Sequence, residues 1–328
     1  MEQKRNRLYG AIAAAGLLVL IFDSRLALES AREGVELCIK TVVPSLFPFF
    51  VLSMLLTNSL RGCVSTPVRT IAKFLGIPNT GASVLIPSVL GGYPVGAKCV
   101  GDLYKSYLIR KEEAERMLAF CSNAGPSFLF GMISGFFPER KMVWTLWFIH
   151  LLSAFLTAAA IPYGKTYEMK MQPEKNGTEK SVILSAATAM LLVCCWVILF
   201  RILIAFLNDW FLWILPEWVQ VLLMGTLELT NGCCELLRIS DVRFRFILCA
   251  SMLSFGGICV VFQTAAVTKG LSLGSYLKGK ILQTLFSLLL SCAVVSEYGL
   301  PLAVFTLILT MFFRKIQKRY GNPVSIPV

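Results

Sequence analysis

The residues best able to do chemistry lie where long apolar stretches are interrupted by glycine, proline and short polar side chains. Four such interruptions occur, at positions 91–96, 122–127, 230–232 and 254–257. A helix that starts at an interruption directs free N–H groups and the positive end of its dipole at the gap, where an anion would be stabilised. A lone Asn or Ser can instead hydrogen-bond a neighbouring helix, so the four breaks carry weight only together. The predicted substrate-binding residues are Gly91, Gly92, Tyr93, Gly96, Lys98, Ser122, Asn123, Gly125, Ser127, Thr230, Asn231, Ser254, Gly256 and Gly257.

The first break is the clearest. Two prolines and three glycines fall within the ten residues from Pro87 to Gly96, inside an uncharged run from Phe74 to Ala97. Lipid cannot satisfy the N–H and C=O groups that such a broken backbone exposes, so the segment must be buried in protein or line a polar cavity. We expect a re-entrant hairpin whose tip belongs to the site. The alternative is an ordinary span kinked by proline.

Ionisable and amide side chains within apolar segments are further candidates, because burying them in a membrane is costly. Glu228 and Gln263 are predicted to bind a coupling cation or a proton, although Glu228 could instead pair with an arginine. Lys98 could neutralise an anion or extend toward the headgroups. Arg201 could line the substrate path or pair with Asp209.

Composition identifies the class of protein. The chain is 56% hydrophobic and 15% charged, as expected for an integral membrane protein in a lipid bilayer. The net charge of +12 comes from cations in short loops, where they set topology, and therefore does not indicate a nucleic-acid partner. The eleven cysteines lack metal-ligand spacing and the single histidine, His150, cannot complete a zinc site, so we expect no metal and no cofactor.

An enzymatic function has little support. The segment Gly131–Gly135 and His150 are the only residues that a membrane serine protease could use, and their spacing is wrong. The sequence contains neither an H-E-x-x-H motif nor a P-loop. We therefore expect a protein that is not an enzyme.

The elements that must position these residues form two similar halves of an all-α polytopic membrane protein. We predict about eight transmembrane helices and two re-entrant hairpins in an inverted repeat, with broken helices at the midplane. Each half is expected to contain a span, a hairpin, a connector, a broken span and a second span. The predicted regions are an N-terminal span and amphipathic helix (1–40), the first repeat (41–164), a cytoplasmic hinge loop (165–180), the second repeat with the final span (181–313) and a basic tail (314–328).

Charge distribution predicts the orientation. With both termini in the cytoplasm, most lysines and arginines fall in inside loops, one of which is the basic stretch from Lys269 to Lys280. The two hairpins then enter from opposite sides, so the repeats are inverted. Three arginines near the second hairpin (Arg238, Arg243 and Arg245) fall outside and fit this orientation less well.

Four motifs carry a resemblance to a known family. They are the stretches 44–49 (PSLFPF), 91–98 (GGYPVGAK), 111–116 (KEEAER) and 122–126 (SNAGP). With them the chain resembles the YlbJ (SpoVV) family of sporulation integral membrane proteins from endospore-forming Firmicutes, which carries a nucleoside recognition or Gate domain and is distantly similar to concentrative nucleoside transporters. The second half matches more loosely, and its break at Asn231 departs from the family pattern.

The resemblance implies a secondary transporter of a small organic anion that acts in sporulation and is needed for a normal spore cortex. The implied substrate is dipicolinic acid, moved across the mother-cell-derived outer forespore membrane. Two alternatives stay open: a nucleoside transporter of the Gate-domain type, and a non-transporting assembly factor of the spore envelope. An oligomer is compatible with the sequence.

Overall fold

The computed structural model describes residues 2–59, 64–161 and 181–320, and every regular element in these ranges is a helix. Five helical segments are long and apolar enough to cross a membrane: Ser24–Leu56, Arg140–Ala160, Val182–Trp210, Val242–Val267 and Gly274–Val295. These segments agree with a polytopic helical membrane protein. The predicted hinge loop at 165–180 lies outside the described residues.

The N-terminal region forms two helices, α1 (Glu2–Phe22) and α2 (Ser24–Leu37), and α2 continues into the first long segment. A π-helical turn, Cys38–Val42, joins α2 to α3 (Val43–Ser59) just before Pro44, whose missing N–H interrupts regular hydrogen bonding. Gly34 allows α2 to pack closely on α10, because a Cβ there would lie 3.1 Å from Ile198 Cα.

The first predicted hairpin forms a helix–turn–helix. After α4 (Thr66–Phe74) and a 3₁₀ turn (Asn79–Val84), the chain enters α5 (Leu85–Leu90), turns, and returns in α6 (Val95–Lys105), which packs on α5. The turn needs glycine because Gly92 has a φ of +73°. The first broken segment follows as α7 (Lys111–Leu118) and α8 (Pro126–Gly131), then a 3₁₀ turn (Ile133–Phe136) and α9 (Arg140–Ala160).

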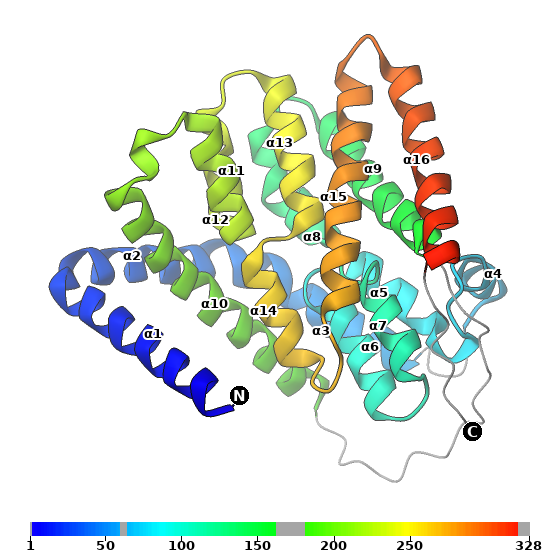
Figure 1. Ribbon diagram of the computed structural model, residues 1–328, viewed down its shortest axis with the longest axis horizontal. Coiled ribbons are helices and arrows are strands. Elements are labelled where there is room, and N and C mark those ends of the chain that lie inside the picture. Colours follow the sequence, from blue (N-terminus) through cyan, green and yellow to red (C-terminus); the bar gives the residue numbers. More distant parts are fainter. Residues whose placement is uncertain (1, 60–63, 162–180, 321–328) are drawn as a thin grey trace.

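The second half of the chain begins with one long helix and also contains a pair of short helices. It consists of α10 (Val182–Trp210), a 3₁₀ turn (Leu212–Ile214), the paired helices α11 (Glu217–Leu227) and α12 (Leu229–Cys234), a 3₁₀ turn (Glu235–Arg238), α13 (Val242–Phe255), α14 (Ile258–Val267), α15 (Gly274–Val295) and α16 (Gly299–Tyr320). The break between α13 and α14 lies at Gly256 and Gly257, which have φ values of +83° and +89°, as predicted from the sequence. In Figure 1 the two helices follow one another, while α15 runs beside α13.

Two sequence predictions about local structure are wrong. The break in the second hairpin is at Glu228, and Thr230, Asn231 and Gly232 lie within α12, because the Glu228 carboxylate accepts a hydrogen bond from Asn231 N and caps that helix. The stretch 269–280 is not a basic loop throughout. Helix α15 already starts at Gly274, and Lys280 is fully buried because protein oxygens replace water around its ammonium.

Candidate functional site

The turn of the first hairpin and the two helix breaks meet in the interior. A Cβ at Gly125 would lie 2.9 Å from both the N and the Cα of Gly92, so the first turn packs backbone against backbone on the break between α7 and α8. In the second half, Gly257 approaches Leu229 N in the same way, at 3.2 Å from its Cβ position. These contacts leave no room for a side chain, which explains why glycines occupy the breaks.

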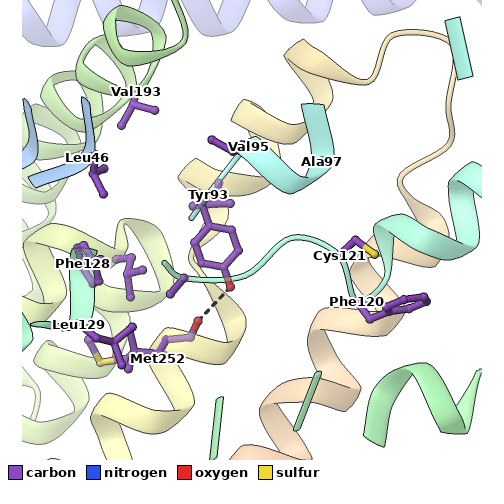
Figure 2. Packing of buried hydrophobic residues seen from close by; sticks show 14 of the residues in the cluster. Leu46, Tyr93, Val95, Ala97, Phe120, Cys121, Phe128, Leu129, Val193 and Met252 are labelled. Carbon is purple, nitrogen blue, oxygen red and sulfur yellow. Dashed lines mark hydrogen bonds between the residues drawn. The ribbon is translucent and has the colours of Figure 1, made fainter. Parts of the chain in front are cut away.

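Tyr93 connects the first hairpin to the second break. Its hydroxyl donates to Leu253 O at 3.0 Å, in the last turn of α13, and its ring lies against Gly256. Figure 2 shows Tyr93 among buried residues of the core, with the dashed line marking this hydrogen bond. The two halves of the protein are therefore linked directly through a predicted site residue.

Lys280 lies at the same junction with 0% of its surface exposed. Its Nζ is 2.5 Å from Ser122 O, 2.8 Å from Gln283 Oε1, 2.9 Å from Tyr93 Oη and 3.5 Å from Ser254 O. All four oxygens are formally neutral, and the ion pairs between described residues do not include Lys280. The amine therefore joins both breaks and, when protonated, carries a positive charge that no carboxylate among the described residues pairs with.

A chain of amides extends from Lys280 to the first break. Gln283 Nε2 donates to Asn123 Oδ1 at 3.0 Å, and Asn123 Nδ2 donates to Phe120 O at 2.8 Å and Ser88 O at 3.3 Å. Asn123 is only 2% exposed. The predicted residue thus uses both ends of its amide to hold the first break against α5 and α15.

His150 closes this network from α9. Its Nε2 accepts a hydrogen bond from Ala124 N at 3.0 Å, and Nδ1 lies 3.3 Å from Ser254 Oγ. A ring nitrogen that accepts from a backbone N–H carries no proton, so the imidazole is neutral with its proton on Nδ1. His150 therefore positions the two breaks and adds no charge to the junction.

The second hairpin has its own buried polar group. Glu228 is 2% exposed, and Oε2 accepts from Asn231 N at 2.7 Å and Asn231 Nδ2 at 2.8 Å. Gln263, the other coupling-ion candidate, is buried on α14 and donates to Cys259 Sγ at 3.2 Å. The Cys259 thiol also interacts electrostatically with Glu228, so both coupling-ion candidates lie near this cysteine.

The remaining sequence candidates take different positions. Lys98 Nζ pairs with Asp102 at 2.7 Å on α6 and stays partly exposed. Gly91 packs close to Pro87 O, and Gly96 packs against the carbonyl of Cys121, so a Cβ would overlap that oxygen. Ser127 is buried in the first turn of α8, and its Oγ finds no partner among the described residues.

Arg201 pairs with Glu33 and not with Asp209, its predicted partner. Its guanidinium contacts Glu33 Oε2 at 2.6 Å, joining α10 to α2. This ion pair lines a cavity of about 280 Å³ that also includes Asp209, Glu235 and Arg238. The mixed charges indicate a hydrated recess separate from the Lys280 junction.

The sequence provided a signal for Lys280 that its assignment to a loop concealed. Buried polar residues follow one face of α15 at spacings of three and four: Tyr276, Lys280, Gln283, Ser287 and Ser291. Such a stripe inside an apolar helix faces other helices rather than lipid. Within the described ranges, the His, Cys, Asp and Glu side chains form no group of three that could hold a metal ion.

Comparison with known proteins gives one relevant similarity. The chain is 29% identical over 164 residues to the sporulation integral membrane protein YlbJ of Bacillus subtilis (strain 168). The alignment covers 48% of this chain and 40% of the relative, so the chain matches less than half of that protein's length. No protein-family model matches the chain, and no solved structure matches it.

Proposed function

We propose that this protein is a secondary transporter that carries a small organic anion across a membrane. The observation that supports this function is the fully buried Lys280 ammonium at the junction of two helix breaks. Removing an ammonium from water costs several kcal/mol in real proteins, and neutral oxygens recover that only in part. An anionic substrate would supply the missing negative charge.

The arrangement of the helices supports a transport cycle. Transporters built from repeats bind substrate between discontinuous helices and open the site to each side in turn. Here Lys280, Asn123 and the turn of the first hairpin are buried together, as in a closed state. In our proposal about eight spans and two re-entrant hairpins form inverted repeats with both termini in the cytoplasm, and movement of a hairpin tip admits the substrate.

The identity of the anion rests on the resemblance to sporulation membrane proteins. We propose dipicolinic acid, moved across the outer forespore membrane of a sporulating cell, and we propose no enzymatic step. A planar dianion suits a site with one ammonium and backbone N–H groups at the starts of α6 and α14. Glu228 and Gln263 are the proposed site for a coupling cation or proton.

Nucleoside transport is the second candidate, because one observation favours it. Glu228 and Asn231 place a carboxylate and an amide at the tip of the second hairpin, and both groups suit the hydroxyls and base edges of a neutral nucleoside. Such a substrate would not balance the charge of Lys280, which is why the anion is preferred.

Flux into proteoliposomes that contain the purified protein tests both candidates. Labelled dipicolinate and labelled uridine are offered in parallel, and Asn123→Leu is the site variant because it removes the three hydrogen bonds of this amide. Dipicolinate uptake that is lost in the variant supports the proposal. Uridine uptake without dipicolinate uptake would assign the nucleoside function, and correctly inserted protein that moves neither would favour an assembly role in the spore envelope.

A further inference from the structure

A charged cavity of about 280 Å³ lies between α2, α10, α11 and the 3₁₀ turn Glu235–Arg238. In Figure 1, α2 and α11 lie at the opposite side of the ribbon from α16. The ionisable side chains that line the cavity are three carboxylates and two guanidiniums: Glu33, Asp209, Glu235, Arg201 and Arg238. We call this cavity the charged recess, and its volume has room for several water molecules.

The charged recess has one carboxylate more than its guanidiniums balance. Glu33 pairs with Arg201 at 2.6 Å, and Glu235 pairs with Arg238 at 3.5 Å. Asp209 has no ion pair or hydrogen bond with the residues that the structure describes. A recess lined by excess negative charge concentrates cations from the adjoining water. Because guanidiniums hold the two paired carboxylates, the remaining charge suits a hydrated monovalent cation better than a chelated metal ion.

The inner end of the charged recess lies next to Glu228, the proposed coupling-ion residue. Met224 lines the recess, and its carbonyl accepts a hydrogen bond from Glu228 N at 2.8 Å. The Cys234 thiol interacts electrostatically with two residues of the recess, Arg201 and Glu235. It interacts in the same way with Glu228. Because Glu228 is buried, the recess stops short of its carboxylate in this closed conformation.

Aromatic side chains place the mouth of the charged recess at the membrane surface. Trp210 directly follows Asp209, and Trp218 lies in the first turn of α11. Both tryptophans are exposed, as is Trp213 between them. Tryptophan is enriched where a membrane meets water. In the proposed orientation, this end of α10 lies on the side of the membrane opposite the termini.

We propose that the charged recess is the entrance through which the coupling ion, a hydrated monovalent cation or hydronium, reaches Glu228 from the side opposite the termini. This inference rests on the proposed function and specifies the route of the ion. In this route Asp209 raises the local cation concentration, and movement of the second hairpin opens the last step from Met224 to the Glu228 carboxylate. An ion gradient would therefore drive uptake only when it is directed from that side.

Thiol labelling tests the route without a transport assay. Cys234 and Cys195 are both exposed, but Cys234 neighbours charges of the recess, whereas Cys195 lies in the middle of the apolar helix α10. Membrane-impermeant methanethiosulfonates that carry either a trimethylammonium or a sulfonate group are applied to oriented vesicles from each side. Mass spectrometry of the digested protein reports the rate at each cysteine, so the native cysteines are kept.

We expect both reagents to modify Cys234 from the side opposite the termini, the cationic one faster, and neither to modify Cys195. Asp209→Asn should lower the ratio of the two rates at Cys234 about fourfold, as for loss of one unit charge about 10 Å away in water. Asp241→Asn is the matched control, because Asp241 is exposed outside the recess and asparagine can still cap α13. Its rate ratio should stay within about 1.5-fold of the wild type.

Transport in proteoliposomes then tests the coupling role with Na⁺ and proton gradients in separate arms. Asp209→Asn should raise the concentration of the coupling ion that gives half-maximal acceleration of dipicolinate uptake about twofold, and Asp241→Asn should leave it unchanged.

Several outcomes would overturn the inference while dipicolinate uptake by the wild type keeps the proposed function. They are an unmodified Cys234, equal rates for the two reagents, modification only from the side of the termini, and no effect of Asp209→Asn. Absence of dipicolinate uptake by folded protein that shows the expected labelling would overturn the proposed function and the coupling role together.

Discussion

Replacing Lys280 with methionine is expected to abolish anion transport while leaving the protein folded. Methionine keeps a long, flexible side chain of similar length but removes the charge and the donors. An ammonium and a carboxylate oxygen about 4 Å apart attract each other by about 4 kcal/mol at an effective dielectric constant of about 20. Truncating one partner of a buried charge pair typically costs about 2 to 5 kcal/mol. The lower figure already predicts a loss of anion affinity of about 30-fold.

The stability of the folded state should change much less. The substitution leaves Ser122 O and Gln283 Oε1 without their donor, at about 1 to 3 kcal/mol for each unsatisfied group. It also removes a buried ammonium whose desolvation costs several kcal/mol, which offsets that loss. We therefore expect a thermal midpoint within a few degrees of the wild type.

Uptake of labelled dipicolinate into proteoliposomes measures the effect, and Lys278→Met is the matched control. Lys278 is exposed on the same helix, two residues before Lys280, and the substitution makes the same change in net charge. The control should retain uptake. Folded Lys280→Met protein that transports within about threefold of the wild type would refute the role of this charge in binding the substrate.

Three further predictions concern packing, helix ends and coupling. Gly279→Ala should lower the free energy of unfolding by about 1 to 3 kcal/mol, because its Cβ would lie 2.6 Å from Ala119 Cα. Gly274→Ala is the control and should leave the thermal midpoint unchanged, because the nearest atom to its Cβ lies at 3.5 Å. Arg116→Met should lower the unfolding midpoint by several degrees, since the guanidinium donates to four backbone carbonyls at the ends of α4 and α9; an unchanged midpoint would contradict this stabilising role. If Glu228 binds the coupling ion, the Glu228→Gln variant should still bind dipicolinate, but a proton or cation gradient should no longer accelerate its uptake. Gradient-driven uptake by this variant at the wild-type rate would exclude Glu228 as the coupling site.

The helix breaks could be predicted because their signals are local. Gly92 adopts a φ of +73°, and Pro94 lacks the N–H that a continuing helix needs. Gly256 and Gly257 likewise adopt positive φ values that other residues avoid. The break at Glu228 was misplaced because no glycine or proline marks it: there the side chain caps the next helix by a hydrogen bond to Asn231 N.

Amino-acid types and their spacing thus determined the class of protein, the positions of most breaks and several residues of the junction, including Tyr93, Ser122, Asn123 and Ser254. Only the tertiary structure decided where the charge lies. A lysine after a polar stretch is compatible with a solvated loop until the neighbouring oxygens are known. Ser122 O and Tyr93 Oη come from segments about 160 and 190 residues away in sequence, and their convergence replaces water around Lys280. Burial of a charge depends on such long-range contacts, which no local pattern records.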